Sequence, residues 1–274
     1  MPIWQAVLLG VVQGLTEFLP ISSTAHLLLV QSWLGRSDEE LKEDPFTVVI
    51  QLGTVVAVFL YFRRDVLALG KAFFQDLYAN RIVTSATPEG RVGKLIIVGT
   101  IPVVVVGLLA KKWLEEHFYN AKSIAIVAIA FALLMAAAEL VVRRRKSAGR
   151  TEGQLTIYDA LFVGAFQVLA LMPGGSRSGT TITAGLFAGL TRETAARFSF
   201  LLSLPSVLGA GLYSLFKKRN DLHDPEALVV GTFVAGVVGY AAIAWLMAYL
   251  RKYPMWLFVA YRIILGVAIL VILA

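Results

Sequence analysis

Residues 10–26 read GVVQGLTEFLPISSTAH, and this stretch decides how the rest of the chain is interpreted. It begins as an apolar run in which two polar side chains, Gln13 and Glu17, lie four residues apart. That spacing places both on one face of a helix. Pro20 then ends the helix, because proline cannot continue the ladder of backbone hydrogen bonds.

Hydroxyl and imidazole side chains follow the break. Ser22 or Ser23 can cap a new helix, Thr24 lies beside them, and His26 comes about one turn later. Carboxylate, hydroxyl and imidazole groups are thus gathered at a broken helix inside an apolar sequence. Ionisable groups in such a place are costly and usually functional.

The composition of the whole chain indicates an all-α polytopic membrane protein, with residues 1–274 as one membrane domain. The chain is 58% hydrophobic and 16% charged, with a mean hydropathy of +0.74. A soluble domain carries about 25% charged residues. The net charge of +7 lies in short loops between apolar runs, which is a pattern of membrane topology and excludes a nucleic-acid partner. The absence of cysteine excludes disulfides and thiol chemistry.

Four short patterns of the first half return in the second half, in the same order. GVVQ at residue 10 returns as GAFQ at 164, ISST at 21 as GSRS at 175, a Tyr at 61 as a Tyr at 213, and VGT at 98 as VGT at 230. We therefore predict a first repeat over residues 1–146, a linker at 147–156 and a second repeat over 157–274. Each repeat should contain one re-entrant helical hairpin and three transmembrane helices, at 46–62, 95–110 and 122–142, and at 198–216, 227–250 and 255–273.

An odd number of crossings in each half turns the second repeat upside down, so the sequence predicts an inverted-topology repeat whose broken helices meet near the midplane. The loops at 63–94, 143–156, 190–197 and 251–254 carry nearly twice as many Lys and Arg residues as the loops on the other side. The positive-inside rule places these loops in the cytoplasm. Both termini and the entry to the first hairpin then lie on the outer face.

The second break reads PGGSRSGTT, residues 173–181, and has the composition of an anion site. Glycines allow the backbone to turn with its N–H groups toward a ligand, and the N-terminus of the next helix favours phosphate. Arg177 adds a planar guanidinium suited to phosphate oxygens. The alternative is a glycine-rich packing kink in which Arg177 pairs with Glu17 for neutrality, although a kink does not need the sequence Ser-Arg-Ser.

Taken together, GLTEFLPISSTAH and PGGSRSGTT resemble the two signature motifs of the bacterial undecaprenyl-pyrophosphate phosphatase family, which is linked to bacitracin resistance. The resemblance extends over the whole chain. It implies a multi-pass enzyme of the bacterial inner membrane with two re-entrant hairpins. Such an enzyme removes the terminal phosphate of a polyprenyl diphosphate and regenerates the lipid carrier for peptidoglycan synthesis. It also implies a catalytic group of four residues, Glu17, Ser23, His26 and Arg177.

Further residues of the two motifs are expected to bind the substrate. These are Gln13, Ser22, Thr24, Gly174, Gly175, Ser176, Ser178 and Thr181. The chain departs from the family pattern at Gln13, where a second carboxylate is common, and at Ala25, where glycine is usual. A divalent cation (Mg²⁺ or Ca²⁺) is the expected cofactor, and with Gln13 in place it would depend on Glu17 and on the diphosphate.

The sequence leaves the attacking group open. Ser23 is the favoured nucleophile because it starts the second helix, with His26 or Glu17 as its base. In the alternative, His26 or a water molecule attacks phosphorus and Ser23 only donates a hydrogen bond.

A different class of function also stays open, since inverted repeats with broken helices are typical of transporters. A polyprenyl-phosphate flippase would use the same anion site without a nucleophile. The partners expected are the lipid substrate, membrane lipid and a second copy of the chain in a homodimer. Two ionisable residues inside apolar segments, Glu139 and Arg262, are expected to snorkel to a membrane surface or to pair.

Overall fold

The computed structural model describes the chain except for residues 36–44, 80, 82–83, 218–223 and 273–274. The regular elements of the described residues are helices, joined by turns and one isolated β-bridge. The helices are α1 (Ile3–Phe18), α2 (Ser23–Trp33), α4 (Pro45–Tyr61), α5 (Arg63–Tyr78), α6 (Pro88–Phe118), α7 (Ala121–Arg144), the short 3-10 helix η1 (Glu152–Gln154), α8 (Ile157–Leu169), α9 (Arg177–Phe187), α10 (Arg192–Lys217), α11 (Pro225–Leu250) and α12 (Trp256–Ile272).

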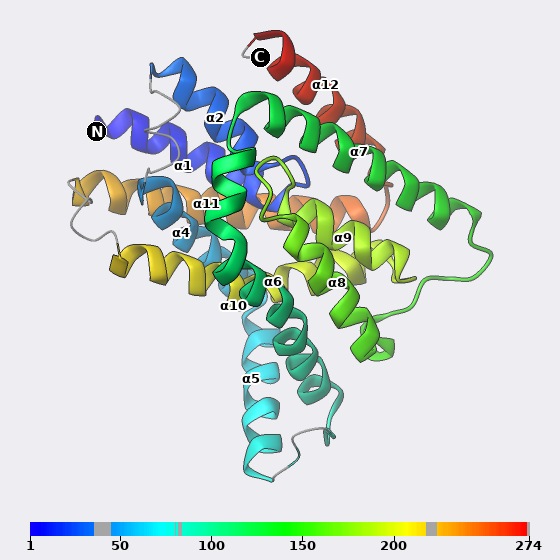
Figure 1. Cartoon of the computed structure of the whole chain (residues 1–274). Helices are drawn as coiled ribbons and strands as arrows, with labels where there is room; N and C mark the ends of the chain where they lie inside the picture. Colours follow the sequence, from blue (N-terminus) through cyan, green and yellow to red (C-terminus); the bar gives the residue numbers. More distant parts are fainter. Residues whose placement is uncertain (36–44, 80, 82–83, 218–223, 273–274) are drawn as a thin grey trace.

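The helices confirm the predicted fold class of an all-α polytopic membrane protein. Within the described residues, α6, α7, α10 and α11 contain apolar segments of 23 to 26 residues, long enough to cross a bilayer. The predicted spans 46–62 and 255–273 form α4 and α12, each of 17 residues. Helix α4 continues into α5 across a bend of 83°. Helix α5 and the first turns of α6 project from the rest of the molecule (Figure 1).

Two pairs of short helices flank the predicted breaks. Helix α1 has 16 residues and α2 has 11, while α8 has 13 and α9 has 11. Each is shorter than the roughly 20 residues that a complete crossing requires. Helix α9 is buried along most of its length, so its N-terminus is held firmly by the helices around it.

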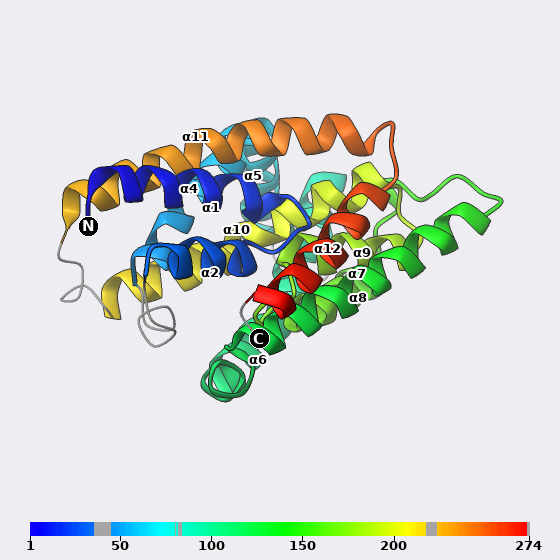
Figure 2. The ribbon, with the colours of Figure 1, turned by 90° about the horizontal axis from the view of Figure 1, so that it is seen from above.

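Equivalent helices of the two halves make reciprocal contacts through glycines. Gly10 of α1 packs against the backbone of Gly231 in α11, and Gly164 of α8 packs against the backbone of Gly99 in α6. A Cβ atom at Gly10 would lie 2.7 Å from the Gly231 carbonyl oxygen, and one at Gly164 would lie 2.3 Å from that of Gly99. The glycines of the repeated GxxQ and VGT patterns therefore form two close helix crossings. Figure 2 shows α1 lying along α11, and α12 lying along α7.

The linker between the halves fixes the far end of α9. The backbone N–H of Arg150 donates to the Gly189 carbonyl (2.8 Å), and its guanidinium donates to the Ala188 carbonyl (2.5 Å). Arg145 donates to the Leu186 carbonyl at 2.9 Å. These cations satisfy the last carbonyls of the helix and lie at the negative end of its dipole. Hydrogen bonding to Asp159 raises the pKa of Arg150, so the Arg150 guanidinium stays charged in these contacts.

Some predictions stay outside what the structure tests. The repeat boundaries 1–146, 147–156 and 157–274, the opposite orientation of the two repeats in a membrane and the side on which the termini lie remain predictions. Parts of two loops used for the topology argument, 36–44 and 218–223, lie outside the described residues.

Candidate active site

The first break turns the chain sharply between α1 and α2. Helix α1 ends at Phe18, and Ser22 takes a positive φ of 75°, which is rare for a residue other than glycine. The Ser22 hydroxyl accepts a hydrogen bond from the Ala25 N–H at 3.4 Å and caps α2. Ser23 is consequently the first residue of α2, as the sequence predicts.

The second break repeats this geometry between α8 and α9. Ser176 has a φ of 62° and accepts a hydrogen bond from the Gly179 N–H at 3.2 Å, so it caps α9 as Ser22 caps α2. Gly174 has a φ of 94°, and a Cβ atom there would lie 2.5 Å from the Ile124 carbonyl oxygen. Ser22 and Ser176 are the only two non-glycine residues with positive φ among the described residues. Such strain usually marks functional sites.

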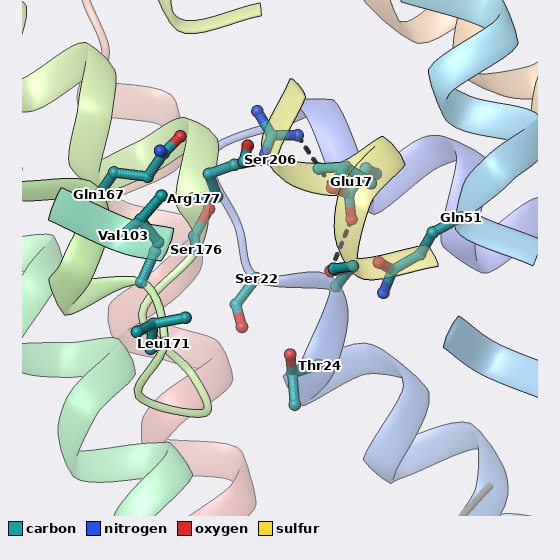
Figure 3. A pocket seen from close by; sticks show the side chains of 14 residues that line it. Glu17, Ser22, Thr24, Gln51, Val103, Gln167, Leu171, Ser176, Arg177 and Ser206 are labelled. Carbon is teal, nitrogen blue, oxygen red and sulfur yellow. Dashed lines mark hydrogen bonds and ion pairs between the residues drawn. The ribbon is translucent and has the colours of Figure 1, made fainter. Parts of the chain in front are cut away.

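An ion pair joins the two breaks, although Glu17 and Arg177 are 160 residues apart in sequence. The Arg177 guanidinium donates to Glu17 Oε1 at 2.9 Å. The other carboxylate oxygen, Oε2, accepts from Ser23 Oγ at 3.2 Å and from Gln13 Nε2 at 3.0 Å. Figure 3 shows the two dashed contacts that connect Arg177, Glu17 and the start of α2. One carboxylate thus connects the serine of the first break with the arginine of the second.

Arg177 retains donors that the protein does not use. Its Nε and Nη1 atoms are buried and have no hydrogen-bond partner within the described part of the chain. A simple neutralising pair with Glu17, as in the kink alternative, would not explain two buried guanidinium nitrogens without a partner among the described residues. Buried donors without partners are rare in native structures and call for an explanation such as a ligand.

These side chains line a pocket of about 220 Å³ between the two halves. Both breaks contribute to its wall, together with residues of α4, α6, α8 and α10. The lining residues are Glu17, Ser22, Ser23, Thr24, Gln51, Val103, Gln167, Ala170, Leu171, Ser176, Arg177, Ser206, Val207 and Ala210. The N-termini of α2 and α9 both begin at this pocket, which favours a negatively charged ligand.

Arg262 of α12 contacts the backbone of both breaks. It is completely buried and donates to the carbonyls of Pro20 (3.4 Å) in the first break and of Gly174 (3.0 Å) and Gly175 (3.3 Å) in the second. Its Nε donates to the Ala128 carbonyl of α7 at 3.2 Å. The expectation that Arg262 snorkels or pairs with a carboxylate was wrong, because five N–H groups in a fixed plane can bind several carbonyls instead. Glu139 does pair, with Arg192.

His26 is not among the residues that line the pocket, and it is bonded at both ring nitrogens. Its Nδ1 contacts the Ser22 carbonyl at 2.7 Å, so Nδ1 carries the proton in this bond. Its Nε2 then accepts from the Tyr261 hydroxyl at 2.6 Å, and the two rings are stacked. The structure therefore brings together three of the four predicted catalytic residues around the pocket. The fourth, His26, lies beside the backbone of Ser22 instead.

The predicted substrate-binding residues divide into two groups. Ser22, Thr24 and Ser176 line the pocket. The others support its wall: Gln13 donates to Glu17, Gly174 and Gly175 accept from Arg262, Ser178 donates to the Leu19 carbonyl (3.1 Å), and Thr181 donates to the Arg177 carbonyl (2.7 Å).

The donor set offers little to a divalent cation. Among the described residues, Glu17 is the only carboxylate that lines the pocket, and both of its oxygens already accept hydrogen bonds. The described residues contain no group of three His, Cys, Asp or Glu side chains suited to a metal. Hard cations require six or more oxygen ligands or water molecules. These residues alone do not form a resident metal site, and a divalent cation bound by Glu17 together with the diphosphate stays a prediction.

Sequence reasoning did not find four residues that shape the site: Gln51, Ser206, Tyr261 and Arg262. Arg262 gave a signal, because an arginine in an apolar helix needs partners. Gln51 also gave one, as a polar residue within the apolar α4. Tyr261 and Ser206 gave none, since tyrosine and serine are common in membrane helices for unrelated reasons.

Comparisons with known proteins agree with this geometry. The profile of the family described as "Bacitracin resistance protein BacA" matches residues 6–268. The chain is 47% identical to a protein of Chloroherpeton thalassium and 44% identical to one of Chlorobium phaeobacteroides, each over 281 aligned positions. Both alignments cover 100% of this chain and 98% of the relative, and both relatives are named undecaprenyl-diphosphatase.

Proposed function

The chain belongs to the bacitracin resistance protein BacA family, and from this premise we propose that its pocket hydrolyses undecaprenyl diphosphate to the monophosphate and inorganic phosphate. It is then a membrane phosphatase that recycles the lipid carrier of peptidoglycan synthesis and contributes to bacitracin resistance. The single observation that carries this function is the contact of Glu17 with both Ser23 and Arg177 at one pocket.

The chemistry follows from those contacts. Ser23 Oγ attacks the terminal phosphorus while its proton passes to Glu17 Oε2, which already accepts a hydrogen bond from it. The bond between that phosphorus and the bridging oxygen breaks, and the bridging oxygen leaves with its electron pair on the polyprenyl monophosphate. Water then attacks the phosphorus of the phosphoserine, the bond between phosphorus and Ser23 Oγ breaks, and inorganic phosphate is released. Of the two available protons, one from the water and one held by Glu17, one returns to Ser23 Oγ and the other leaves with the phosphate.

The surroundings stabilise the charge that moves during this step. Arg177 has two nitrogens, Nε and Nη1, that are unpaired among the described residues and can donate to the phosphate oxygens, and the N-termini of α2 and α9 add the positive ends of two helix dipoles. These groups are in place before the substrate enters, so they need little reorganisation. Phosphoryl transfer depends mainly on such positioning and electrostatic stabilisation.

His26 has a supporting role in this proposal. With Nδ1–H bonded to the Ser22 carbonyl and Nε2 bonded to Tyr261, it fixes the strained backbone immediately before Ser23. Glu17, which contacts Ser23 directly, takes the place of the base.

Release of phosphate in detergent tests the function and separates an enzyme from a flippase, which needs a bilayer. Purified wild-type protein should release phosphate from polyprenyl diphosphate. Arg177→Ala should lower turnover at least roughly a hundredfold, the usual scale for one electrostatic group. The control is His117→Ala, at the exposed end of α6, which should behave as wild type. Near-wild-type turnover in Arg177→Ala would contradict the proposed active site.

The membrane arrangement completes the proposal. Both termini and the first hairpin face the outside, in agreement with the cationic loops that the positive-inside rule assigns to the cytoplasm. The pocket then opens toward the outer face, where the diphosphate is exposed. A homodimer stays a prediction.

A further inference from the structure

Gln167 of α8 has a buried amide without a partner among the described residues. The residue is 1% exposed and lines the pocket, yet neither Oε1 nor Nε2 makes a hydrogen bond to the part of the chain that the structure describes. Leaving a buried amide unpaired costs stability, and native proteins rarely do so. Because Gln167 lines the pocket, a ligand bound there can supply the missing hydrogen-bond partners.

The repeat explains why this amide is free. Its equivalent in the first half is Gln13, whose Nε2 donates to Glu17, four residues later on the same helix face. Four residues after Gln167 stands Leu171, which also lines the pocket. The second half therefore keeps the amide but lacks the carboxylate that binds it in the first half. Gln167 faces the same pocket with both donors and its acceptor available.

Its position differs from that of the reacting groups. In Figure 3, Gln167 lies on one side of the pocket and Glu17 on the other, with the Arg177 guanidinium between them. A phosphate held by Ser23 and Arg177 would occupy the side nearer Glu17. A ligand that also meets Gln167 must extend further, and the second phosphate of a diphosphate is such an extension.

We propose that Gln167 is a specificity residue that binds the lipid-bearing phosphate of the diphosphate through its amide N–H groups, an inference that rests on the proposed function. Arg177 and Ser23 engage the terminal phosphate, and Gln167 reads the one that stays on the product. A neutral amide binds phosphate oxygens less strongly than a cation does. It can therefore select a diphosphate without retaining the monophosphate product.

Two small ligands separate this role from general anion binding. Methylenediphosphonate has two phosphorus groups and is not hydrolysed, whereas inorganic phosphate has one. We expect Gln167→Met to weaken binding of methylenediphosphonate to the detergent-solubilised protein roughly tenfold to a hundredfold, the effect of losing a hydrogen bond to a charged group. Affinity for inorganic phosphate should stay unchanged. The matched control is Gln75→Met, on the exposed face of α5, which should alter neither affinity.

The unfolding temperature of Gln167→Met is a second measurement, and unlike the affinity for the diphosphonate it should not fall. Replacing an unpaired buried amide with an apolar side chain of similar length removes a desolvation cost, so the ligand-free Gln167→Met protein should unfold at an equal or higher temperature. A structural role would lower that temperature. A variant that is less stable or fails to fold would show that the amide has an internal partner, and it would overturn the proposal. Equal weakening of both ligands, or of neither, would do the same.

The two proposals fail in different ways. If wild-type protein binds methylenediphosphonate through Gln167 but releases no phosphate from polyprenyl diphosphate, the enzyme function is wrong and the diphosphate subsite stands. If wild-type protein releases phosphate and Gln167→Met keeps its affinity for methylenediphosphonate, the subsite is wrong and the enzyme function stands.

Discussion

Replacing Arg262 with Met should reduce catalysis while the protein remains folded. The wild-type guanidinium binds three carbonyls of the two breaks, those of Pro20, Gly174 and Gly175, and one carbonyl of α7. At about 1 kcal/mol of net stability for each of these four contacts, the loss is about 4 kcal/mol. Removing a buried charge without a carboxylate partner offsets part of this loss. The net fall in the free energy of unfolding should therefore be about 1–3 kcal/mol.

Turnover should fall as well, because Arg262 bonds to both breaks and helps to fix their relative position. A displacement of about 1 Å in a reacting geometry costs about a hundredfold in rate. We expect phosphate release by Arg262→Met to fall roughly tenfold to a hundredfold while the purified protein remains folded. Arg262→Lys keeps the charge but loses the planar set of donors, so it should be equally impaired. The control is Arg143→Met, an exposed cation at the end of α7.

The measurements are turnover in detergent and the unfolding temperature of each variant. Wild-type turnover in Arg262→Met would refute the positioning argument. Full recovery in Arg262→Lys would show that only the charge matters, and the geometric reasoning would be wrong.

Three further predictions follow from the same contacts. His26→Gln, which keeps an amide able to donate to the Ser22 carbonyl, should retain far more turnover than His26→Ala, whereas equal losses in both would show that the imidazole transfers a proton. In this cysteine-free chain, Lys122→Cys should react with an impermeant thiol reagent added to intact cells and Ser147→Cys should not, and the opposite labelling would invert the topology. Mg²⁺ added without substrate should leave the unfolding temperature unchanged, since Glu17 is the only pocket carboxylate, and a clear rise would reveal a resident cation site.

The sequence predicted the parts of the fold that depend on local patterns. Pro20 and the Ser-Arg-Ser segment mark the breaks because proline and serine act on the backbone within a few residues. Uninterrupted apolar runs predicted α6, α7, α10 and α11 because a bilayer requires a fixed length. The crossings at Gly10 and Gly164 lie at motifs that the two halves share, although the sequence did not predict these contacts.

The rest of the site depends on contacts between residues far apart in the chain. His26 meets Tyr261 across 235 residues, and Arg262 reaches Pro20 across 242. Neither pairing follows from a local pattern, so the sequence placed His26 in the catalytic group as base or nucleophile and predicted that Arg262 snorkels or pairs. The free amide of Gln167 likewise becomes visible only when the pocket and the partners of Gln13 are known together.

Transfer of labelled phosphate to Ser23 tests the proposed chemistry most directly. Wild-type protein is mixed with polyprenyl diphosphate labelled at the terminal phosphate and quenched within the first turnover. The label should then be found on the peptide that contains Ser23, with no label and almost no turnover in Ser23→Ala, because no other oxygen replaces the lost one at the start of α2. Several per cent of turnover in Ser23→Ala, together with unlabelled wild-type protein, would contradict the mechanism and leave Ser23 as a hydrogen-bond donor to the substrate.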